Sequence, residues 1–343
     1  MTTPPAPPGI DVPKVSAWLA ANVPGLEPPV AFSLISGGRS NLTYGFTDAA
    51  GVRRALRRPP TGGVLSTAHD MTREWRFISA LADTPVPVPP PLAYCADTEV
   101  TGASFYVMGF VGGTVLGDEA AGRAFPEESR RAAAENTIDT MAALHRVDPH
   151  EVGLSDMIRP GGYVERQLRR WHRQVHASGA DDLALFDEVH DQLKARMPEG
   201  GTGIVHGDFR PGNLCYAPDG TVTGVFDWEL ATFGEPLADL GWLISTWAEP
   251  GDKLASTPGP STAPGFPGRD ALVARYADAT GTDVSDLPYY VAFNRWRAAC
   301  IGAGVVARYR AGVMGDDSYD ADARSGDVTR QAASALAMIR ELT

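Results

Sequence analysis

The sequence predicts an α+β protein with a small β-rich lobe followed by a larger, mainly helical lobe. In the first third of the chain, short alternating segments are separated by glycine and proline breaks, a pattern typical of paired strands. In the remainder, apolar residues recur mostly at helical spacing. The length of 343 residues suits two domains of about 150 residues each. The pattern changes near Phe110, so we expect one domain over residues 1–111 and another over residues 112–343.

The composition argues against several classes of protein. Hydrophobic residues make up 43% and charged residues 21%, which is typical of a globular chain. The net charge of −12 argues against a nucleic-acid-binding surface, because a phosphate backbone requires a cationic one. The three cysteines form no CxxC pair, so neither a disulfide framework nor a thiolate zinc site is expected. With no apolar run of about 18 residues and no cationic leader, we expect a cytoplasmic protein with no membrane segment, as a monomer or a homodimer.

The small lobe is expected to begin with a helix and to continue as a sheet. Asp11 is a suitable N-cap for a short amphipathic helix. A second helix is expected after the first three strands, and a proline-rich extended segment then leads to a further strand. The expected strands are Ala31–Ser36, Leu42–Thr47, Val52–Arg57 and Ser104–Phe110, and the second helix is Thr67–Leu81.

The larger lobe is expected to surround two short strands, IVHGD and VTGVFDW, with helices. The expected helices are Pro126–Val147, Tyr163–His176, Leu183–Met197 and Gly234–Ala248, with more helix towards the C-terminus. Residues 249–269 are polar and rich in Gly and Pro, which predicts a structureless, mobile lid or insert. A cleft between two lobes is the usual place for a ligand.

Three polar residues in short loops after apolar strands indicate a magnesium site. Asp208, Asn213 and Asp227 lie within twenty residues of one another. Carboxylate and amide oxygens are the ligands that Mg²⁺ prefers, and Mg²⁺ is commonly shared with substrate phosphates. Transfer of a γ-phosphoryl group needs metal-binding oxygens, a positioned base and cations on the phosphates. The three residues together therefore favour phosphoryl transfer.

The motifs HGDFRPGN and FDWE resemble those of the aminoglycoside phosphotransferase (choline-kinase-like) family. The longer string FDWELATFGEPLADLGW is most similar to the kinase domain fused to acyl-CoA dehydrogenases in animals. The resemblance covers roughly residues 30 to 310 and is most specific over residues 204–242. It implies the protein-kinase-like two-lobe fold, with a small β-rich N-lobe and a larger helical C-lobe. It also implies transfer from ATP, with GTP not excluded, to a hydroxyl group of a small molecule, with Mg²⁺ as cofactor.

The resemblance assigns roles to particular residues. Asp208 corresponds to the catalytic base that accepts the proton of the substrate hydroxyl, and Arg210 lies where many kinases have a lysine beside the transferring phosphate. Asn213 and Asp227 correspond to the metal ligands. His206 is expected to form structural hydrogen bonds.

Two acidic residues near these motifs have weaker assignments. Asp239 is expected to cap a helix or to hold the loop through an ion pair. The role of Glu229 stays open between metal binding and structure.

The nucleotide is expected to bind in the amino-terminal half. A glycine turn between two strands could direct backbone N–H groups at phosphates, although such a turn can equally be a simple hairpin. Arg57 occupies the place of the kinase lysine that holds the α- and β-phosphates, with Arg58 as the alternative and Glu74 as the helix partner. Backbone groups at the end of the strand near Phe110 would meet the adenine. The remaining expected nucleotide-binding residues are Gly37, Gly38, Arg39, Ser40, Asn41, Met108, Gly109 and Val111.

The acceptor is not fixed by the sequence. A polycationic aminoglycoside would favour carboxylates, but the acidic cluster Asp316, Asp317, Asp320 and Asp322 can equally be a solvated face. Arg295 and Arg297 would suit an anionic acceptor such as a hydroxy acid or a CoA thioester, or would form ion pairs with neighbouring helices. Three hypotheses follow: a small-molecule phosphotransferase, an antibiotic-inactivating aminoglycoside kinase, or a nucleotide-binding pseudo-enzyme without acceptor turnover.

Overall fold

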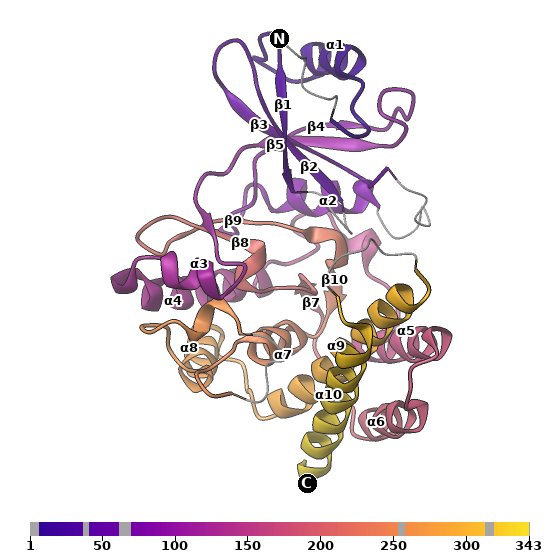
Figure 1. Cartoon of the computed structure of the whole chain (residues 1–343). Coiled ribbons are helices and arrows are strands. Elements are labelled where there is room, and N and C mark those ends of the chain that lie inside the picture. Colours follow the sequence, from indigo (N-terminus) through magenta and orange to yellow (C-terminus); the bar gives the residue numbers. More distant parts are fainter. Residues whose placement is uncertain (1–6, 37–40, 62–69, 253–257, 313–318, 343) are drawn as a thin grey trace. The chain divides into compact units, whose positions relative to one another are not determined.

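The computed structural model describes residues 7–36, 41–61, 70–252, 258–312 and 319–342 (Figure 1). By its contacts the chain divides into a first unit, Met1–Gly113 with Thr223–Ala231, and a second unit, Thr114–Val222 with Thr232–Thr343. The domain boundary after residue 111 remains a prediction. The expected glycine turn at residues 37–40 and the acidic residues 316 and 317 lie outside the described residues.

The first unit is built on a five-stranded antiparallel sheet in the order β1-β2-β3-β5-β4. Its strands are β1 (Ala31–Ser36), β2 (Leu42–Thr47), β3 (Arg53–Arg58), β4 (Pro91–Cys95) and β5 (Phe105–Gly109), and its helices are α1 (Val12–Asn22) and α2 (Met71–Leu81). The strands predicted at 31–36 and 42–47 are confirmed, and those predicted at 52–57 and 104–110 are confirmed to within a residue at each end. The short 3₁₀ turn η3 (Trp228–Leu230) belongs to this unit by its contacts.

N-cap residues explain where the two helices of the first unit begin. Asp11 caps α1 as predicted, because its Oδ1 accepts the Lys14 N–H at 3.1 Å. Asp70 caps α2 by accepting from Thr72 and Arg73. The described part of α2 therefore begins at Met71, later than the predicted residue 67, and residues 67–69 lie outside the described part of the chain.

The second unit is mainly helical, as predicted. Its helices are α3 (Glu119–Ala124), α4 (Glu127–His145), α5 (Tyr163–Ser178), α6 (Leu183–Ala195), α7 (Pro236–Thr246), α8 (Arg269–Thr280), α9 (Leu287–Arg310) and α10 (Ala321–Glu341). Its short strands are β6 (Thr114–Val115), β7 (Gly203–Val205), β8 (Leu214–Tyr216) and β10 (Thr232–Gly234), and β9 (Val222–Val225) runs from this unit into the first. β7 pairs with β10 and β6 with β8, both antiparallel.

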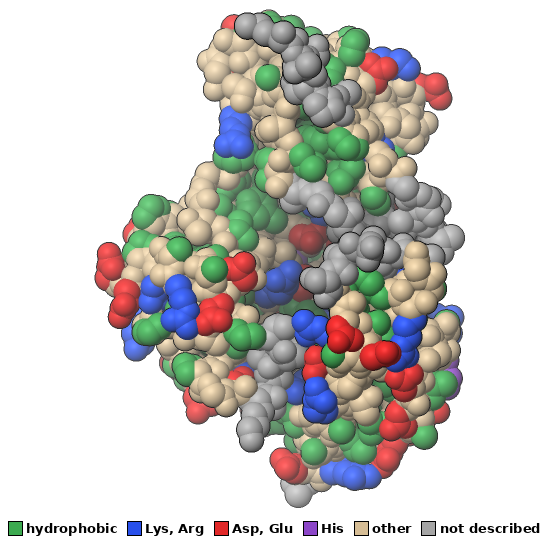
Figure 2. Space-filling model, in the orientation of Figure 1, with side chains coloured by type: hydrophobic (Ala, Val, Ile, Leu, Met, Phe, Trp, Pro, Cys, Tyr) green, Lys and Arg blue, Asp and Glu red, His purple; other side chains and the backbone are tan. Residues whose placement is uncertain are grey.

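Helix α9 is the centre of the second unit. It contacts α5, α6, α7 and α10, and this explains why residues on every side of α9 are buried. The approach to α7 is close, because a Cβ added to Gly241 would lie 2.8 Å from the backbone of Tyr290. On the face drawn in Figure 2, basic and acidic side chains of this unit are interspersed. None of the helices in the described part of the chain combines the length and apolarity needed to cross a membrane.

Two predictions for the second unit differ from the structure. Helix α3 was not predicted from the sequence, since it is only six residues long. The prediction that residues 249–269 are structureless is wrong for residues 258–268, which pack against other parts of the chain. Trp247 Nε1 donates to Pro267 O at 3.0 Å, and Arg130 Nη1 donates to Pro264 O at 2.7 Å. These partners are distant in sequence, and local composition therefore could not reveal them. Residues 253–257 lie outside the described part of the chain.

Candidate active site

In the second unit, buried strand β7 leads directly into the loop that holds Asp208. The carboxylate of Asp208 accepts hydrogen bonds on both oxygens: Trp242 Nε1 donates to Oδ1 at 2.7 Å, and Asn213 Nδ2 donates to Oδ2 at 2.8 Å. A carboxylate held on both sides has a fixed orientation without being buried, since the Asp208 side chain is 21% exposed. The loop therefore presents a positioned carboxylate that can accept a proton.

The contacts of Asn213 orient its amide. This residue ends a short 3₁₀ turn, η2 (Pro211–Asn213), and its Nδ2 also donates to the backbone oxygen of Asp208 at 2.9 Å. Both donated bonds use the amide nitrogen, so the amide oxygen is the atom left to serve as a metal ligand. Arg210 lies between these residues in the loop, with Nε 3.4 Å from the Asp208 carboxylate and a side chain that is 40% exposed.

Two side chains from distant helices hold the backbone of this loop. Asp239 on α7 accepts from the backbone N–H groups of His206 at 2.5 Å and Gly207 at 2.7 Å. Arg297 on α9 donates through Nη2 to Gly207 O at 2.6 Å. Gly207 itself has φ +83°, in the left-handed region that favours glycine. Asp239 and Arg297 are thus positioning residues for the Asp208 loop.

The charge of Asp239 is maintained although the side chain is fully buried. Burial alone would raise the pKa of Asp239, but hydrogen bonding and charge from His145, the charge of His206 and the Gly207 N–H together lower it. His206 accepts the Asp208 N–H through Nδ1 at 3.2 Å, a structural bond of the kind expected for it. The sequence did not assign Trp242 any role, although it ends the string that carried the family resemblance.

In the first unit, Arg57 of β3 connects three polar groups. Its Nε donates to Glu74 Oε2 at 2.8 Å, its Nη1 donates to Thr43 Oγ1 at 3.3 Å, and its Nη2 donates to Asp227 Oδ1. Burial alone would lower the pKa of Arg57, but its partners, above all the charge of Glu74, raise it above its usual value. The guanidinium fork, which a lysine lacks, makes these contacts simultaneously.

The neighbouring Arg58 has a different role, because successive strand residues point to opposite faces. Its guanidinium donates to backbone oxygens of Thr101, at 3.0 Å, and of Gly9, and its Nε donates to Pro59 O. The structure therefore places Arg57, and not the alternative Arg58, beside Glu74 and Asp227.

Glu74 is completely buried within a hydrogen-bonded group. Asn41 Nδ2 donates to its Oε1 at 2.6 Å and Tyr106 OH donates to its Oε2 at 2.9 Å. Burial raises the pKa of Glu74, and Arg57 opposes that change. The expected pairing of Glu74 with Arg57 is present in the structure. The side chain of Asn41 is directed at Glu74 and, at 3.4 Å, at Glu229, and the expected contact of this residue with phosphate stays a prediction.

Asp227 has an unusual, left-handed backbone conformation. Its φ of 65° and ψ of 58° make it the one non-glycine residue with positive φ in the described part of the chain. Carboxylate oxygens of Glu74, Asp227 and Glu229 lie within 4.8 Å of one another. Because these are hard oxygen donors, with Asp227 and Glu229 only partly buried, the group fits a Mg²⁺ ion.

At the end of β5, the backbone N–H of Gly109 already has a hydrogen-bond partner and is not available to a base. The N–H of Gly109 donates to Pro90 O at 2.8 Å, and Met108 is buried. The guanidinium carbon of Arg53 lies 3.7 Å from the centre of the Phe110 ring. Phe110 and Val111 follow the strand, so their backbone groups are the better candidates for contact with a base.

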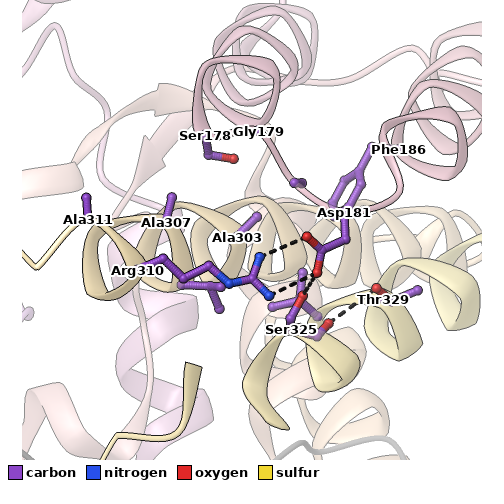
Figure 3. Close-up of a pocket in the computed structure, with 13 residues that line it drawn as sticks. Ser178, Gly179, Asp181, Phe186, Ala303, Ala307, Arg310, Ala311, Ser325 and Thr329 are labelled. Carbon is purple, nitrogen blue, oxygen red and sulfur yellow. Dashed lines mark hydrogen bonds and ion pairs between the residues drawn. The ribbon is translucent and has the colours of Figure 1, made fainter. Parts of the chain in front are cut away.

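The second unit has a pocket of about 310 Å³ between helices α5, α6, α9 and α10 (Figure 3). None of the predicted site residues lines it. Its one arginine, Arg310, is already paired with Asp181 at 2.8 Å and with Asp322 at 2.9 Å.

Comparisons with known proteins agree with a kinase-like fold. A solved candidate aminoglycoside phosphotransferase from Ralstonia eutropha superposes with a TM-score of 0.81 and 30% identity, covering 96% of this chain and 98% of that one. Choline kinase from Cryptosporidium parvum superposes with a TM-score of 0.67 at 11% identity, covering 97% and 96%, and this likeness shows the fold alone.

The family follows from the sequence comparisons. Residues 31–290 match the model of the phosphotransferase enzyme family, and the chain belongs to that family. Over 315 residues it is 33% identical to acyl-CoA dehydrogenase family member 11 of Gallus gallus, covering 87% of this chain and 40% of that protein. The chain thus spans about two fifths of the length of this curated relative. The predicted fold and the predicted family resemblance are confirmed.

Proposed function

We propose that this protein transfers the γ-phosphoryl group of ATP to a hydroxyl group of a small molecule. Membership of the phosphotransferase family supports the reaction class. The observation that carries the proposal is the Asp208 carboxylate, held by Trp242 and by Asn213 five residues further on. That arrangement suits a base that must receive a proton from one direction.

In the proposed reaction, the acceptor oxygen forms a new bond to the γ-phosphorus while the bond from that phosphorus to the bridging oxygen breaks. ADP leaves with the electron pair of the broken bond, and the hydroxyl proton passes to the Asp208 carboxylate. Arg210, exposed beside Asp208, would balance negative charge on the transferring group.

We assign the nucleotide side of the reaction to residues of the first unit. There Asp227 would hold Mg²⁺, with Glu229 as a further ligand. Asn213 of the second unit, whose amide oxygen is the atom left for a metal, stays the second ligand that the family resemblance predicts. When bound, Mg²⁺ neutralises charge on the β- and γ-phosphates. Arg57, kept in place by Glu74, would contact the phosphates. The glycine turn expected at residues 37–40, which lie outside the described residues, would contribute backbone N–H groups. Backbone groups of Phe110 and Val111 would meet the base.

Several residues considered for the acceptor site are buried or already have other partners. Arg297 holds the Asp208 loop and Arg295 is buried. Asp320 is the N-cap of α10, and Asp322 pairs with Arg310. The acceptor class is therefore best found by experiment.

The test measures acceptor-dependent ADP release with a panel of hydroxyl compounds: aminoglycosides, macrolides, hydroxy acids, hydroxyacyl-CoAs, amino alcohols and sugars. With an acceptor in hand, Asp208→Asn should lower kcat by about 10³-fold and keep nucleotide binding. Asp270→Asn, an exposed residue of α8, is the matched control and should keep full activity.

Three outcomes distinguish the hypotheses. Turnover confined to aminoglycosides identifies the antibiotic-inactivating enzyme. ATP binding without turnover of any acceptor in the panel supports the pseudo-enzyme and contradicts the proposal. Full activity of Asp208→Asn contradicts the assignment of the base.

A further inference from the structure

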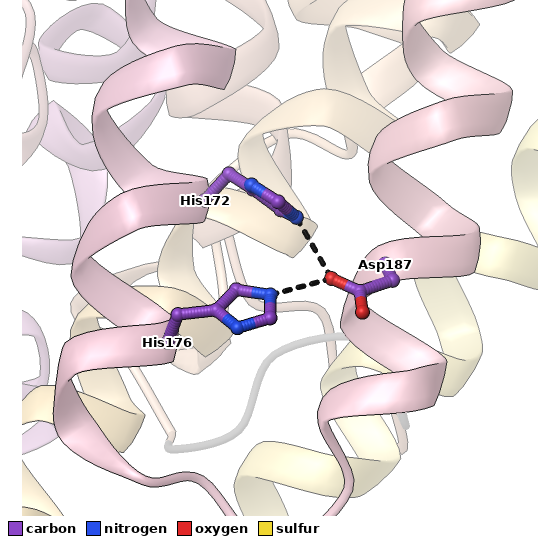
Figure 4. Close-up of side chains that lie close together, drawn as sticks. All are labelled: His172, His176 and Asp187. Atoms are coloured by element: carbon purple, nitrogen blue, oxygen red, sulfur yellow. Dashed lines mark hydrogen bonds and ion pairs between the residues drawn. The ribbon is translucent and has the colours of Figure 1, made fainter.

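Helices α5 and α6 of the second unit bring together two imidazoles and a carboxylate that the proposed reaction does not use. His172 and His176 lie one turn apart on α5, and both point at Asp187 on α6 (Figure 4). The Nε2 atoms of His172 and His176 are 2.7 Å and 2.6 Å from the same oxygen, Asp187 Oδ1. Three potential ligand atoms from two helices therefore converge on one point.

We propose that His172, His176 and Asp187 form a binding site for a divalent transition-metal ion such as Zn²⁺, which links α5 to α6. Imidazole nitrogen and carboxylate oxygen are common zinc ligands, and histidines four residues apart on a helix face the same side. The ligand atoms all lie within 4.8 Å of one another. This donor set differs from the all-oxygen group around Asp227, which suits Mg²⁺.

The observed distances are those of hydrogen bonds, and only a small opening would admit the ion. Zinc–ligand bonds of about 2.0–2.2 Å in a tetrahedral site separate the ligands by about 3.3 Å. The pairs now at 2.7 Å and 2.6 Å would thus move apart by about 0.6 Å and about 0.7 Å. The side chains can adjust and leave room for water as a fourth ligand, because those of His176 and Asp187 are 41% and 45% exposed.

A third imidazole supports the ring of His172. His190 stacks on it with ring centroids 4.2 Å apart and an interplanar angle of 27°. His190 is held in turn by Asp191, whose Oδ1 lies 3.0 Å from its Nδ1, and its ring lies 6.0 Å from that of Trp296. His190 is thus a positioning residue for one proposed ligand, with Trp296 behind it.

The experiment uses the full chain, stripped of metal and kept free of Mg²⁺. Cobalt(II) is added first, because its d–d absorption reports a tetrahedral site with nitrogen ligands, and Zn²⁺ binding is then measured by calorimetry. We expect one Co²⁺ per chain with a tetrahedral spectrum, displaced by Zn²⁺. At 100 times its dissociation constant, Zn²⁺ should raise Tm by about 4 °C.

Matched variants locate the ion. His176→Ala and Asp187→Asn should remove the cobalt spectrum, and His190→Phe should weaken binding about 10-fold. His150→Ala, an exposed histidine outside the cluster, should keep the spectrum, as should Asp227→Asn in the proposed Mg²⁺ site. Circular dichroism verifies that each variant is folded. Absence of a tetrahedral spectrum in the unaltered protein, or an unchanged spectrum in folded His176→Ala, would overturn the proposal.

Discussion

The indole nitrogen of Trp242 donates a 2.7 Å hydrogen bond to Oδ1 of Asp208. Trp242 lies on α7, 34 residues after Asp208, and the same helix carries Asp239, which holds the loop backbone. One turn of α7 therefore controls both the position of the loop and the orientation of its carboxylate.

Replacing Trp242 by Phe should reduce turnover without affecting nucleotide binding. The substitution removes one hydrogen bond to a charged group, worth about 1.5 kcal/mol, so we expect kcat to fall about 10-fold. Steady-state kinetics with a saturating acceptor measures this. Trp247→Phe removes a comparable indole bond, to Pro267 O, away from Asp208 and should leave kcat unchanged. An equal loss of kcat in both variants would refute a specific role for Trp242.

Exchange of Arg57 for Lys should raise the KM for the nucleotide about 10-fold, because lysine cannot make the forked contacts to Glu74, Thr43 and Asp227. Lysine retains the charge, so the buried Glu74 keeps a cationic partner and the fold is preserved. Arg58→Lys is the matched control. It should lower Tm through lost bonds to backbone oxygens and leave the KM unaltered. A raised KM in Arg58→Lys together with an unchanged KM in Arg57→Lys would show that the two arginines have been assigned to the wrong faces of the sheet.

Asp239→Asn should destabilise the protein in a pH-dependent manner. The carboxylate has a lowered pKa in the folded state, so its contribution is present above the unfolded value near 3.8 and is lost as the pH falls through the folded value. We expect the free energy of unfolding to fall by about 3 kcal/mol at pH 7, and this difference should shrink towards zero in strong acid. Urea denaturation of both proteins across this range measures the difference. A difference that stays constant with pH would show that the charge of Asp239 does not contribute.

Asp227→Asn should weaken Mg²⁺ binding, and so raise the Mg²⁺ requirement of the reaction, more than Glu229→Gln does. Asparagine tolerates the positive φ of this position, so the fold should be retained while the charged ligand is lost. We expect the Mg²⁺ concentration for half-maximal activity to rise about 100-fold in Asp227→Asn and about 10-fold in Glu229→Gln. Titration of activity with Mg²⁺ at fixed ATP measures both. Identical Mg²⁺ curves for Asp227→Asn and the unaltered protein would exclude Asp227 as a ligand.

Elements with strong local signals could be predicted from the sequence. The first strands and the long helices were predicted to within a few residues, because alternation and helical spacing depend on the chain's own pattern. The packed segment 258–268 was missed, since it is held by contacts with Arg130 and Trp247, which are distant in sequence. Helix α3 was missed because its six residues are too few to show a helical pattern.

The sequence by itself determined which residue types this protein offers for chemistry. Asp208, Asn213 and Asp227 are recognised by their spacing, and each of them lies next to a short strand. Only the tertiary structure decided how their neighbours are used. It directed Arg57 at Glu74 and Arg58 at backbone oxygens, made Arg297 a support of the Asp208 loop, and placed Trp242 on the carboxylate. The physical reason is that a side chain's partner depends on which elements pack together, and that packing is set by the whole fold.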